Sequence, residues 1–287
     1  MARKKRQFSP EVVKIAKEYN LIDDILFTKA AEDKDFCQEI LRTVCDDPEL
    51  VVIENTAQRK MQNLAGRSVI FDALCKLKDK TLVDIEVQKA NDDDHQRRIR
   101  YNGAVLAANV TKKNTKFKDV PNVIVVFISS FDLFKKGCAL YHVDRVIRET
   151  KERVENGLSE IYVNAAVKDE SNVAELMRIF VELKAYNERM FPVVSSVKKI
   201  YKETEEGVQC MCALTEKLYK KGEARGIEKG IEKGIEKGRV EGRTGGFLES
   251  IKKMVENFNV SANKAMDVLE IPENERSFYI EKLKEMK

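Results

Sequence analysis

The chain has 287 residues, which is enough for one core domain and an appendage. Charged residues make up 35 % of it, yet the formal net charge is only +4, so no global basic field marks it as a nucleic-acid-binding protein. Its six scattered cysteines indicate reduced thiols of an intracellular protein and argue against a disulfide framework. No apolar run reaches the roughly 20 residues of a membrane span, so we expect a cytoplasmic protein without a membrane partner.

The N-terminal part combines a basic segment with predicted helices. Four cations lie among its first six residues: Arg3, Lys4, Lys5 and Arg6. They are candidates for DNA contact, with a disordered, solvated end as the alternative. Ser9 followed by Pro10 predicts the start of a helix, because proline fits the first helical turn. Apolar residues recur at helical spacing over residues 21–26 and 36–44, and residues 50–53 are expected to form a first strand.

The next two predicted strands, 68–77 and 81–88, carry different kinds of side chain on their two faces. Side chains alternate along a strand, so odd positions share one face and even positions share the other. The odd positions are nearly all apolar: Val69, Phe71, Ala73, Cys75, Leu77, Val83, Ile85 and Val87. The even positions carry the polar set: Asp72, Asp84, Glu86 and Gln88. A hairpin must keep the apolar sets together, because a slip of one residue would bury the acids.

The register of this hairpin brings two acids face to face. With residues 78–80 as the loop, counting inward places Asp72 opposite Glu86 and Asp84 opposite Leu74, and paired Cβ atoms lie roughly 5 Å apart. Like charges directly opposite each other destabilise a sheet, so a divalent cation between the acids is a natural explanation. The alternative is an ordinary half-buried hairpin whose polar face meets water.

Two features favour a functional site over a solvated face. Ile70, Leu74 and Leu82 also lie on the acidic face, so we expect that face to be at least partly covered. The segment 92–101 follows at once and adds arginines beside the acids. Carboxylates on a strand pair, an amide two residues further on and a basic helix form a set that phosphodiester hydrolysis could use.

Further elements complete an α/β pattern. A helix is expected from about residue 93 to 110, with the acids of 92–94 at its N-terminus. The continuous apolar run 123–129 is typical of a strand buried on both faces. After an amphipathic stretch around 143–154, a short strand at 161–163 and then a helix at 172–186 are predicted.

The C-terminal tail has a different character. From Gly222 to Gly242 a glycine recurs at every fourth residue, interleaved with Ile-Glu-Lys, which fits either a helix packed closely along its glycine row or a flexible charged linker. Beyond it, an apolar stripe at 247–258 and helix starts at Ser261 and Pro272 predict a small helical unit, either a docking or oligomerising element or a DNA reader. We therefore expect a homo-oligomer that forms through the tail.

We divide the chain into four parts. These are residues 1–18, a basic segment and helix; 19–200, the core; 201–246, a helical, glycine-repeat linker; and 247–287, the helical C-terminal unit.

The motifs in this order resemble those of a known family. Phe71-Asp72, Ile85-Glu86-Val87-Gln88 and Arg98-Ile-Arg-Tyr101 follow one another as in the PD-(D/E)XK nuclease superfamily, in its transposase-like branch of recombination-promoting nucleases. Asp24-Ile-Leu-Phe27 fits an upstream helix of that branch, and the resemblance covers roughly residues 20–190 together with the glycine-rich tail. Phe71 stands where the superfamily has proline, and Gln88 stands where many members have lysine.

The resemblance implies a restriction-endonuclease-like α/β core, with a central mixed β-sheet flanked by helices and a helical C-terminal tail. It also implies a Mg²⁺ site, or Mn²⁺ in its place, held by Asp72, Glu86 and the carbonyl of Val87. Gln88 would orient the attacking water and so join the two acids as a catalytic residue. The candidate phosphate contacts are Arg98 and Tyr101. Asp24 is a candidate supporting acid, and Asp84 is either a supporting acid or a solvated one.

The implied function is a metal-dependent DNA endonuclease of the recombination-promoting kind, associated with mobile elements and with the nucleoid when bound to DNA. The alternative is a catalytically inactive scaffold that binds DNA or protein through the same fold. Gln88 keeps this alternative open, because an amide cannot stabilise developing negative charge as an ammonium group does.

Overall fold

The computed structural model describes residues 6–63 and 66–285. The chain divides into two compact units, Met1–Glu216 and Lys217–Lys287. The four-part division expected from the sequence stays a prediction. Of the basic N-terminal segment, residues 3–5 lie outside the described residues, while Arg6 pairs with Glu216 (Nη2 to Oε2, 2.6 Å).

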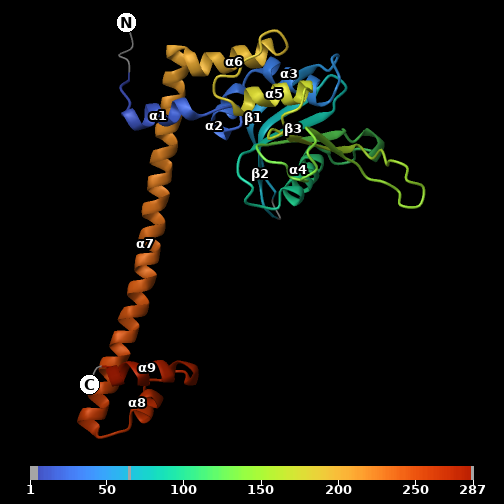
Figure 1. Ribbon diagram of the computed structural model, residues 1–287. Helices are drawn as coiled ribbons and strands as arrows, with labels where there is room; N and C mark the ends of the chain where they lie inside the picture. The colour runs from blue at the N-terminus through green and yellow to red at the C-terminus, as the bar shows by residue number, and fades with distance from the viewer. Residues whose placement is uncertain (1–5, 64–65, 286–287) are drawn as a thin grey trace. The chain divides into compact units, whose positions relative to one another are not determined.

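A six-stranded mixed sheet forms the centre of the first unit (Figure 1). Its strands are β1 (Val52–Met61), β2 (Val69–Leu77), β3 (Leu82–Gln88), β4 (Val123–Ser129), β5 (Leu140–Val143) and β6 (Leu158–Asn164). The spatial order is β1-β2-β3-β4-β6-β5; β3, β4 and β6 run parallel, and the other neighbours pair antiparallel. This mixed sheet, flanked by helices and followed by a helical tail, confirms the predicted fold class.

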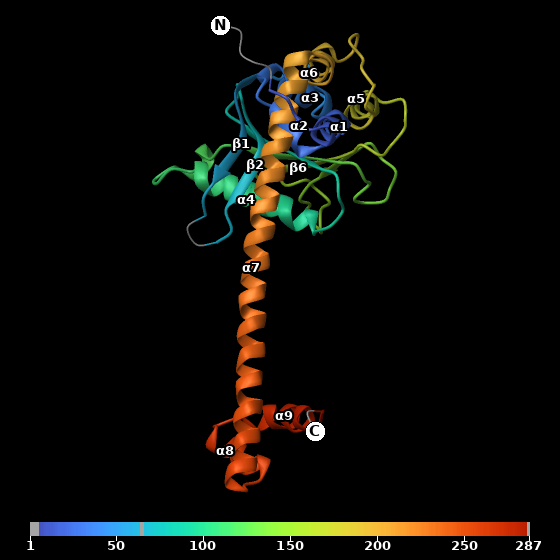
Figure 2. The same cartoon turned by 90° about the vertical axis from the view of Figure 1, so that its left-hand side faces the viewer.

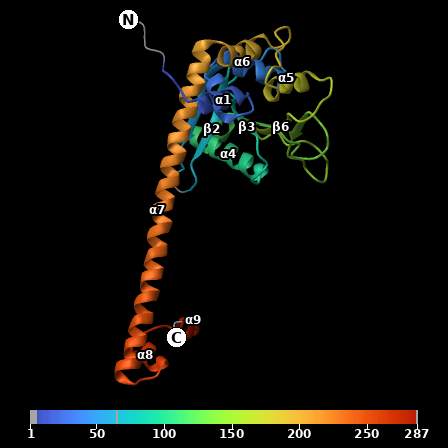
Figure 3. The same ribbon diagram turned by 60° about the vertical axis from the view of Figure 1, so that its left-hand side comes forward.

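Helices cover both faces of the sheet (Figures 1 and 3). Several helices contribute to the core on one face: α1 (Pro10–Glu18), α2 (Asp24–Ala30), α3 (Lys34–Val44), α5 (Asn172–Val181), α6 (Pro192–Glu203) and the first turns of α7 (Glu205–Phe258). The opposite face packs against α4 (His95–Val110), which connects the parallel strands β3 and β4. A 3-10 turn, η1 (Phe117–Asp119), precedes β4. Burial on both faces explains the continuous apolar sequence of β4.

Side-chain caps begin the helices where the sequence predicted them. Ser9 accepts a hydrogen bond from the Val12 N–H at 3.2 Å, and Pro10 occupies the first turn of α1. Asp94 accepts a hydrogen bond from the Arg97 N–H at 3.1 Å and starts α4. The cap at Asp94 fixes where the arginines of α4 lie relative to β3.

The β2–β3 hairpin has the predicted register but not the predicted faces. Leu74 lies opposite Asp84, and the last pair of the ladder is Ala73 with Ile85. However, Val69 and Phe71 pack in the cluster with α4, whereas Ala73 and the later odd residues of β2 pack on the other face. The expectation that all odd residues of β2 share one face is therefore wrong.

The change of face coincides with an interruption in the β1–β2 ladder. The pairs run from Ala57–Ala73 to Arg59–Phe71 and skip Gln58 and Asp72, which would otherwise oppose each other. Gln58 has a positive φ of 51°, which breaks the regular pleat of β1 at this point. Ile70 falls beyond this break and is 51 % exposed, contrary to the prediction that it helps to cover the acids.

Other elements differ from prediction mainly in length. The first strand runs from 52 to 61 instead of 50 to 53, and β6 is longer than the predicted 161–163. The segment 143–154 contains the end of β5 and an isolated bridge between Val146 and Arg153. The helix predicted at 172–186 ends at Val181, and α6 was not predicted.

The glycine-rich repeat is helical. It lies in α7 (Glu205–Phe258), so it is not the flexible linker considered from sequence. Within the second unit, α8 (Ala262–Val268) and α9 (Glu273–Glu285) pack against the end of α7 around Ile251, Met266 and Tyr279 (Figure 2). Among the helices of the described residues, none combines the length and apolar character that crossing a membrane requires.

Candidate active site

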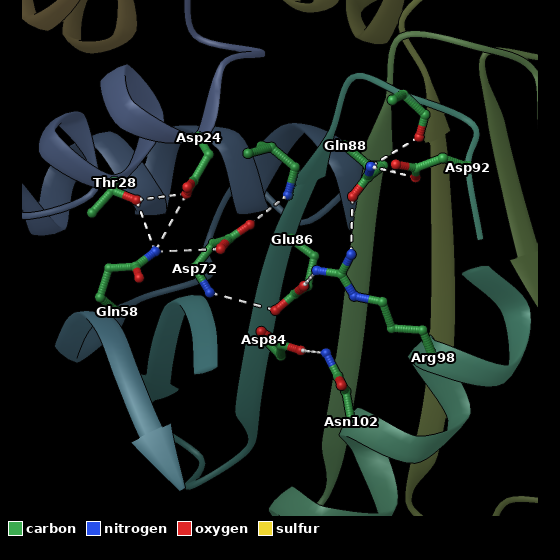
Figure 4. Close-up of polar contacts among 12 residues, drawn as sticks. Asp24, Thr28, Gln58, Asp72, Asp84, Glu86, Gln88, Asp92, Arg98 and Asn102 are labelled. Atoms are coloured by element: carbon green, nitrogen blue, oxygen red, sulfur yellow. Dashed lines mark hydrogen bonds and ion pairs between the residues drawn. The ribbon is translucent and has the colours of Figure 1, made fainter. Parts of the chain in front are cut away.

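Three acidic side chains of the hairpin are buried together beside α4 (Figure 4). Asp72 is 8 % exposed, and Asp84 and Glu86 are fully buried. The Asp72 N–H donates to Glu86 Oε1 at 3.4 Å, and the Val87 N–H donates to Asp72 Oδ2 at 3.0 Å. These three acids are therefore largely shielded from water, which rules out the solvated alternative for them.

The backbone of Val87 faces Asp72. In a strand, the backbone groups of successive residues point to opposite neighbours. The Gln88 carbonyl accepts a hydrogen bond from the Ser130 N–H on the β4 side at 3.0 Å, so the N–H and carbonyl of Val87 point toward β2. The hydrogen bond from Val87 to Asp72 agrees with this direction. The structure thus brings Asp72, Glu86 and the Val87 backbone together.

Two residues one turn apart on α4 contact the buried acids. Arg98 Nη2 lies 2.5 Å from Glu86 Oε2, and its Nη1 donates to Gln88 Oε1 at 2.9 Å. Asn102 Nδ2 donates to Asp84 Oδ2 at 3.4 Å. Arg98 was predicted to lie near the acids. Asn102 was missed, although its spacing of four residues from Arg98 places both on one helix face.

The amide of Gln88 is held by the segment that follows β3. Its Nε2 donates to the Ala90 carbonyl at 2.8 Å and lies 3.4 Å from Asp92 Oδ1. Lys89 lies elsewhere, because its ammonium group pairs with Asp23 at 2.7 Å. The amide, and not the neighbouring lysine, therefore shares the site with the buried acids.

A second group of polar side chains meets Asp72 from the side of α2. Gln58 Nε2 donates to Thr28 Oγ1 at 3.0 Å and to Asp24 Oδ1 at 3.3 Å, and lies 3.4 Å from Asp72 Oδ1. Asp24 was predicted as a supporting acid, and the structure connects it to Asp72 through this amide. Gln58 was missed, because nothing in the alternation of β1 distinguishes it from other exposed polar residues of the strand.

Burial sets the charge state of these acids. It raises the pKa of Asp72 to about 8, and the neighbouring charge of Glu86 adds to the shift. Burial likewise raises the pKa of Asp84 far above its ordinary value. The pKa of Glu86 is also raised by burial, while Arg98 opposes that shift. One guanidinium thus faces three carboxyl groups, and burial disfavours the ionised form of each of them.

A groove of about 1020 Å³ is lined in part by Arg98 and Asn102, the two residues of α4 that contact the buried acids. Its lining includes four arginines and two aspartates: Arg67, Arg97, Arg98, Arg100, Asp93 and Asp94. Tyr101 also lines it, accepting a hydrogen bond from Asn63 Nδ2 at 2.9 Å and donating one to the Arg67 carbonyl at 2.6 Å. The tyrosine therefore holds Asn63 and Arg67 against α4, and Arg98 belongs to both the groove and the acidic site.

The donor set suits a hard divalent cation. No group of three or more His, Cys, Asp or Glu side chains within 6–63 and 66–285 has metal-binding geometry. Mg²⁺ needs fewer protein ligands, because it retains several waters and prefers oxygen donors. Asp72, Glu86 and the Val87 carbonyl provide such donors, and Asp84 Oδ1 is buried without a hydrogen-bond partner. The excess of buried negative charge fits a cation at this place.

Comparison with protein families agrees with this geometry. The model of PD-(D/E)XK nuclease family transposases matches residues 24–212, more than half of the chain. The chain belongs to this family. The match confirms the resemblance drawn from the motifs and spans every candidate site residue, from Asp24 to Tyr101. No curated protein and no solved structure matches the chain significantly. This PD-(D/E)XK nuclease family transposase domain ends before the glycine row of α7 begins.

Proposed function

We propose that this PD-(D/E)XK family member is a metal-dependent DNA endonuclease that hydrolyses phosphodiester bonds. The observation that carries the proposal is the buried contact between Asp72 and Glu86, which Arg98 connects to a groove lined by four arginines. Family membership supports a nuclease, and the excess of buried acid supports a cation-dependent one.

In this proposal, Asp72, Glu86 and the Val87 carbonyl hold Mg²⁺, with Mn²⁺ as a substitute. When bound, the cation would polarise the scissile phosphate and lower the pKa of a water molecule. The protein's own part is to hold the oxygen ligands in place. The Val87 N–H fixes one oxygen of Asp72, and Arg98 fixes one oxygen of Glu86.

Gln88 is proposed to orient the attacking water. Its side-chain oxygen already accepts one hydrogen bond from Arg98 and has a second lone pair for a water O–H. Its amide nitrogen is held by the Ala90 carbonyl, which fixes the direction of that oxygen.

The groove is proposed to bind the DNA backbone. Arg97, Arg98 and Arg100 present planar guanidinium groups suited to phosphate oxygens, and Tyr101 stabilises the wall from which they project. Contacts of this kind position DNA without reading its sequence. We therefore propose a substrate recognised by its backbone, as expected of a recombination-promoting nuclease.

The same proposal includes a second copy of the chain as partner and a place in the cytoplasm, at the nucleoid when DNA is bound. Six free cysteines agree with a reducing compartment. Self-association through the tail would supply two active sites for a reaction that cuts two strands.

Substitution of the acids tests the proposed chemistry. Asp72→Asn and Glu86→Gln should each reduce Mg²⁺-dependent nicking of supercoiled plasmid to background, with an unchanged circular dichroism spectrum. Glu54→Gln is the matched control, because Glu54 is an exposed acid of the neighbouring strand β1. Nicking by both variants at the wild-type rate, or undiminished wild-type nicking in EDTA, would end this proposal.

A catalytically silent scaffold is the second candidate. It is favoured by Gln88 in the place of lysine and by the guanidinium of Arg98 already paired with Glu86. Calorimetric titration with Mg²⁺ or Mn²⁺ distinguishes the two. A nuclease should bind the cation in the wild type and lose binding in Asp72→Asn, whereas a silent scaffold has no reason to bind it.

A further inference from the structure

Gln58 has an unusual backbone conformation for a residue inside a β-strand. Eight non-glycine residues of the described chain have positive φ, and Gln58, at 51°, is the one that lies inside a strand. The left-handed region is costly for residues with a Cβ, and asparagine or aspartate tolerate it better than glutamine. Since β1 is an edge strand, no neighbour on its outer side imposes this break. Such strain in a folded protein points to a use for it.

The break directs the side chain of Gln58 toward the acids (Figure 4). The two N–H groups of its amide face three oxygens, on Thr28, Asp24 and Asp72, at 3.0, 3.3 and 3.4 Å respectively. Thr28 Oγ1 in turn donates to Asp24 Oδ1 at 3.0 Å. The amide is thus anchored on α2 by two contacts and reaches Asp72 with the third.

The Gln58 side chain and the backbone of β3 bind different oxygens of the Asp72 carboxyl group. The Val87 N–H binds Oδ2, and the Gln58 amide binds Oδ1, so the two donors together set the rotation of the carboxyl group. Each carboxylate oxygen has two acceptor sites, so these hydrogen bonds leave room for a cation. A neutral donor between Asp24 and Asp72 also keeps a second carboxylate from contacting the first directly.

We propose that Gln58 is a positioning residue, which holds the Asp72 carboxyl group in the orientation needed to bind the divalent cation. This inference rests on the proposed function. It explains why a glutamine occupies a position where glycine or asparagine would be less strained: a glycine has no amide, and the amide of asparagine is one methylene too short to reach.

Because the backbone of Gln58 is strained, its replacement by glycine should change stability and function in opposite directions. Gln58→Gly removes the amide and relieves the backbone, so the full-length variant should be as stable as the wild type or more stable in urea without divalent cations. Its affinity for Mn²⁺, measured by calorimetry, and its rate of plasmid nicking should each fall by about 10-fold or more, as when a residue that orients a metal ligand is lost. Gln58→Asn should show the same functional loss.

Lys80→Gly is the matched control. Lys80 also has a positive φ, 75°, but lies in the β2–β3 loop away from the acids, so glycine should increase stability there and leave Mn²⁺ affinity and nicking unchanged. Gln58→Gly with Mn²⁺ affinity and nicking within twofold of the wild type would overturn the positioning role, as would a loss of stability that accompanies the loss of function. A wild type that neither binds Mn²⁺ nor nicks DNA would instead refute the proposed function, and this inference would fall with it.

Discussion

At the scale of single residues, cation binding and burial favour opposite charge states of the Asp72 carboxyl group. To bind the proposed cation it must be ionised, yet burial and the charge of Glu86 raise its pKa to about 8. In the absence of a cation, the folded protein therefore keeps a proton on this carboxyl group that the unfolded chain would release near its ordinary pKa of 3.8. Between these two values the folded state binds more protons than the unfolded state, so stability falls as the pH rises.

This linkage predicts a pH profile. In EDTA, the free energy of unfolding of the wild type should decrease from pH 5 to pH 8, and the profile of Asp72→Asn should be flatter. The difference could reach about 4 kcal/mol over three pH units, since one pKa unit corresponds to about 1.4 kcal/mol. Urea titrations at several pH values measure it, and the difference between the two profiles reports on this carboxyl group together with Asp84, whose pKa the charge of Asp72 also raises.

The control for this experiment is again Glu54→Gln, which should keep the wild-type slope because Glu54 is exposed. Mg²⁺ added at pH 8 should restore stability to the wild type and not to Asp72→Asn. Parallel profiles for the wild type and Asp72→Asn would contradict the raised pKa.

Sequence alone predicted part of this site. The hairpin register follows from the alternation of apolar residues. From this register the sequence predicts that Leu74 lies opposite Asp84 and that Asp72 lies close to Glu86, as the structure has them. Gln58 could not be found in this way, because its role depends on a backbone break and on contacts with α2. Such a contact joins residues far apart in sequence and leaves no periodic signal.

At the scale of elements, the interruption of the β1–β2 ladder has the largest effect. It places Phe71 in the core beside α4 while Ala73, two residues later, packs on the opposite face. Alternation predicts the faces of side chains only for an unbroken pleat. The prediction for β2 therefore failed at Asp72, where the ladder with β1 is interrupted. Regular elements such as β4, whose bounds matched the apolar run 123–129, were predictable because both of their faces are buried.

The early end of α5 has a comparable local cause. The Lys198 side chain of α6 is fully buried, and its ammonium group donates to the carbonyls of Ile179, Glu182 and Ala185 at 2.7, 2.6 and 3.2 Å. A cation at a helix C-terminus satisfies carbonyl groups that have no partner in the helix. The chain can therefore leave the helix after Val181, where periodicity alone predicted continuation to residue 186.

Lys198→Met should destabilise the protein. Methionine preserves most of the apolar stem but leaves three carbonyls without this donor, so a loss of about 3 kcal/mol is expected. Urea unfolding at pH 6 measures it, and Lys199→Met is the control. The Lys199 side chain is partly exposed and pairs with Glu188, so its loss should cost far less than the loss of Lys198. Equal losses for both variants would remove the capping role of Lys198.

At the scale of the whole molecule, the second unit presents an open helix surface. A Cβ added at any glycine of the row from Gly222 to Gly242 would meet no atom within 4 Å, so no contact within the described part of the second unit requires these glycines. The neighbouring row of Ile227, Ile231 and Ile235 is 58, 58 and 67 % exposed. A glycine row costs helix stability, and an exposed isoleucine row is unfavourable in water, so both rows are expected to be covered by a second copy of the chain.

Alanine substitution distinguishes a helix that packs against a second copy from a helix without a partner. In the full-length chain, replacing Gly226, Gly230 and Gly234 by alanine should stabilise the isolated helix by about 1 kcal/mol at each position. If a second copy packs along the row, the added methyl groups hold the helices apart, and the dissociation constant should rise at least about 10-fold despite the better helix former. Gly245→Ala, on α7 but outside the row, should leave association unchanged. Light scattering over a range of concentrations measures the masses, and a wild type that stays monomeric throughout would remove the dimer from this account.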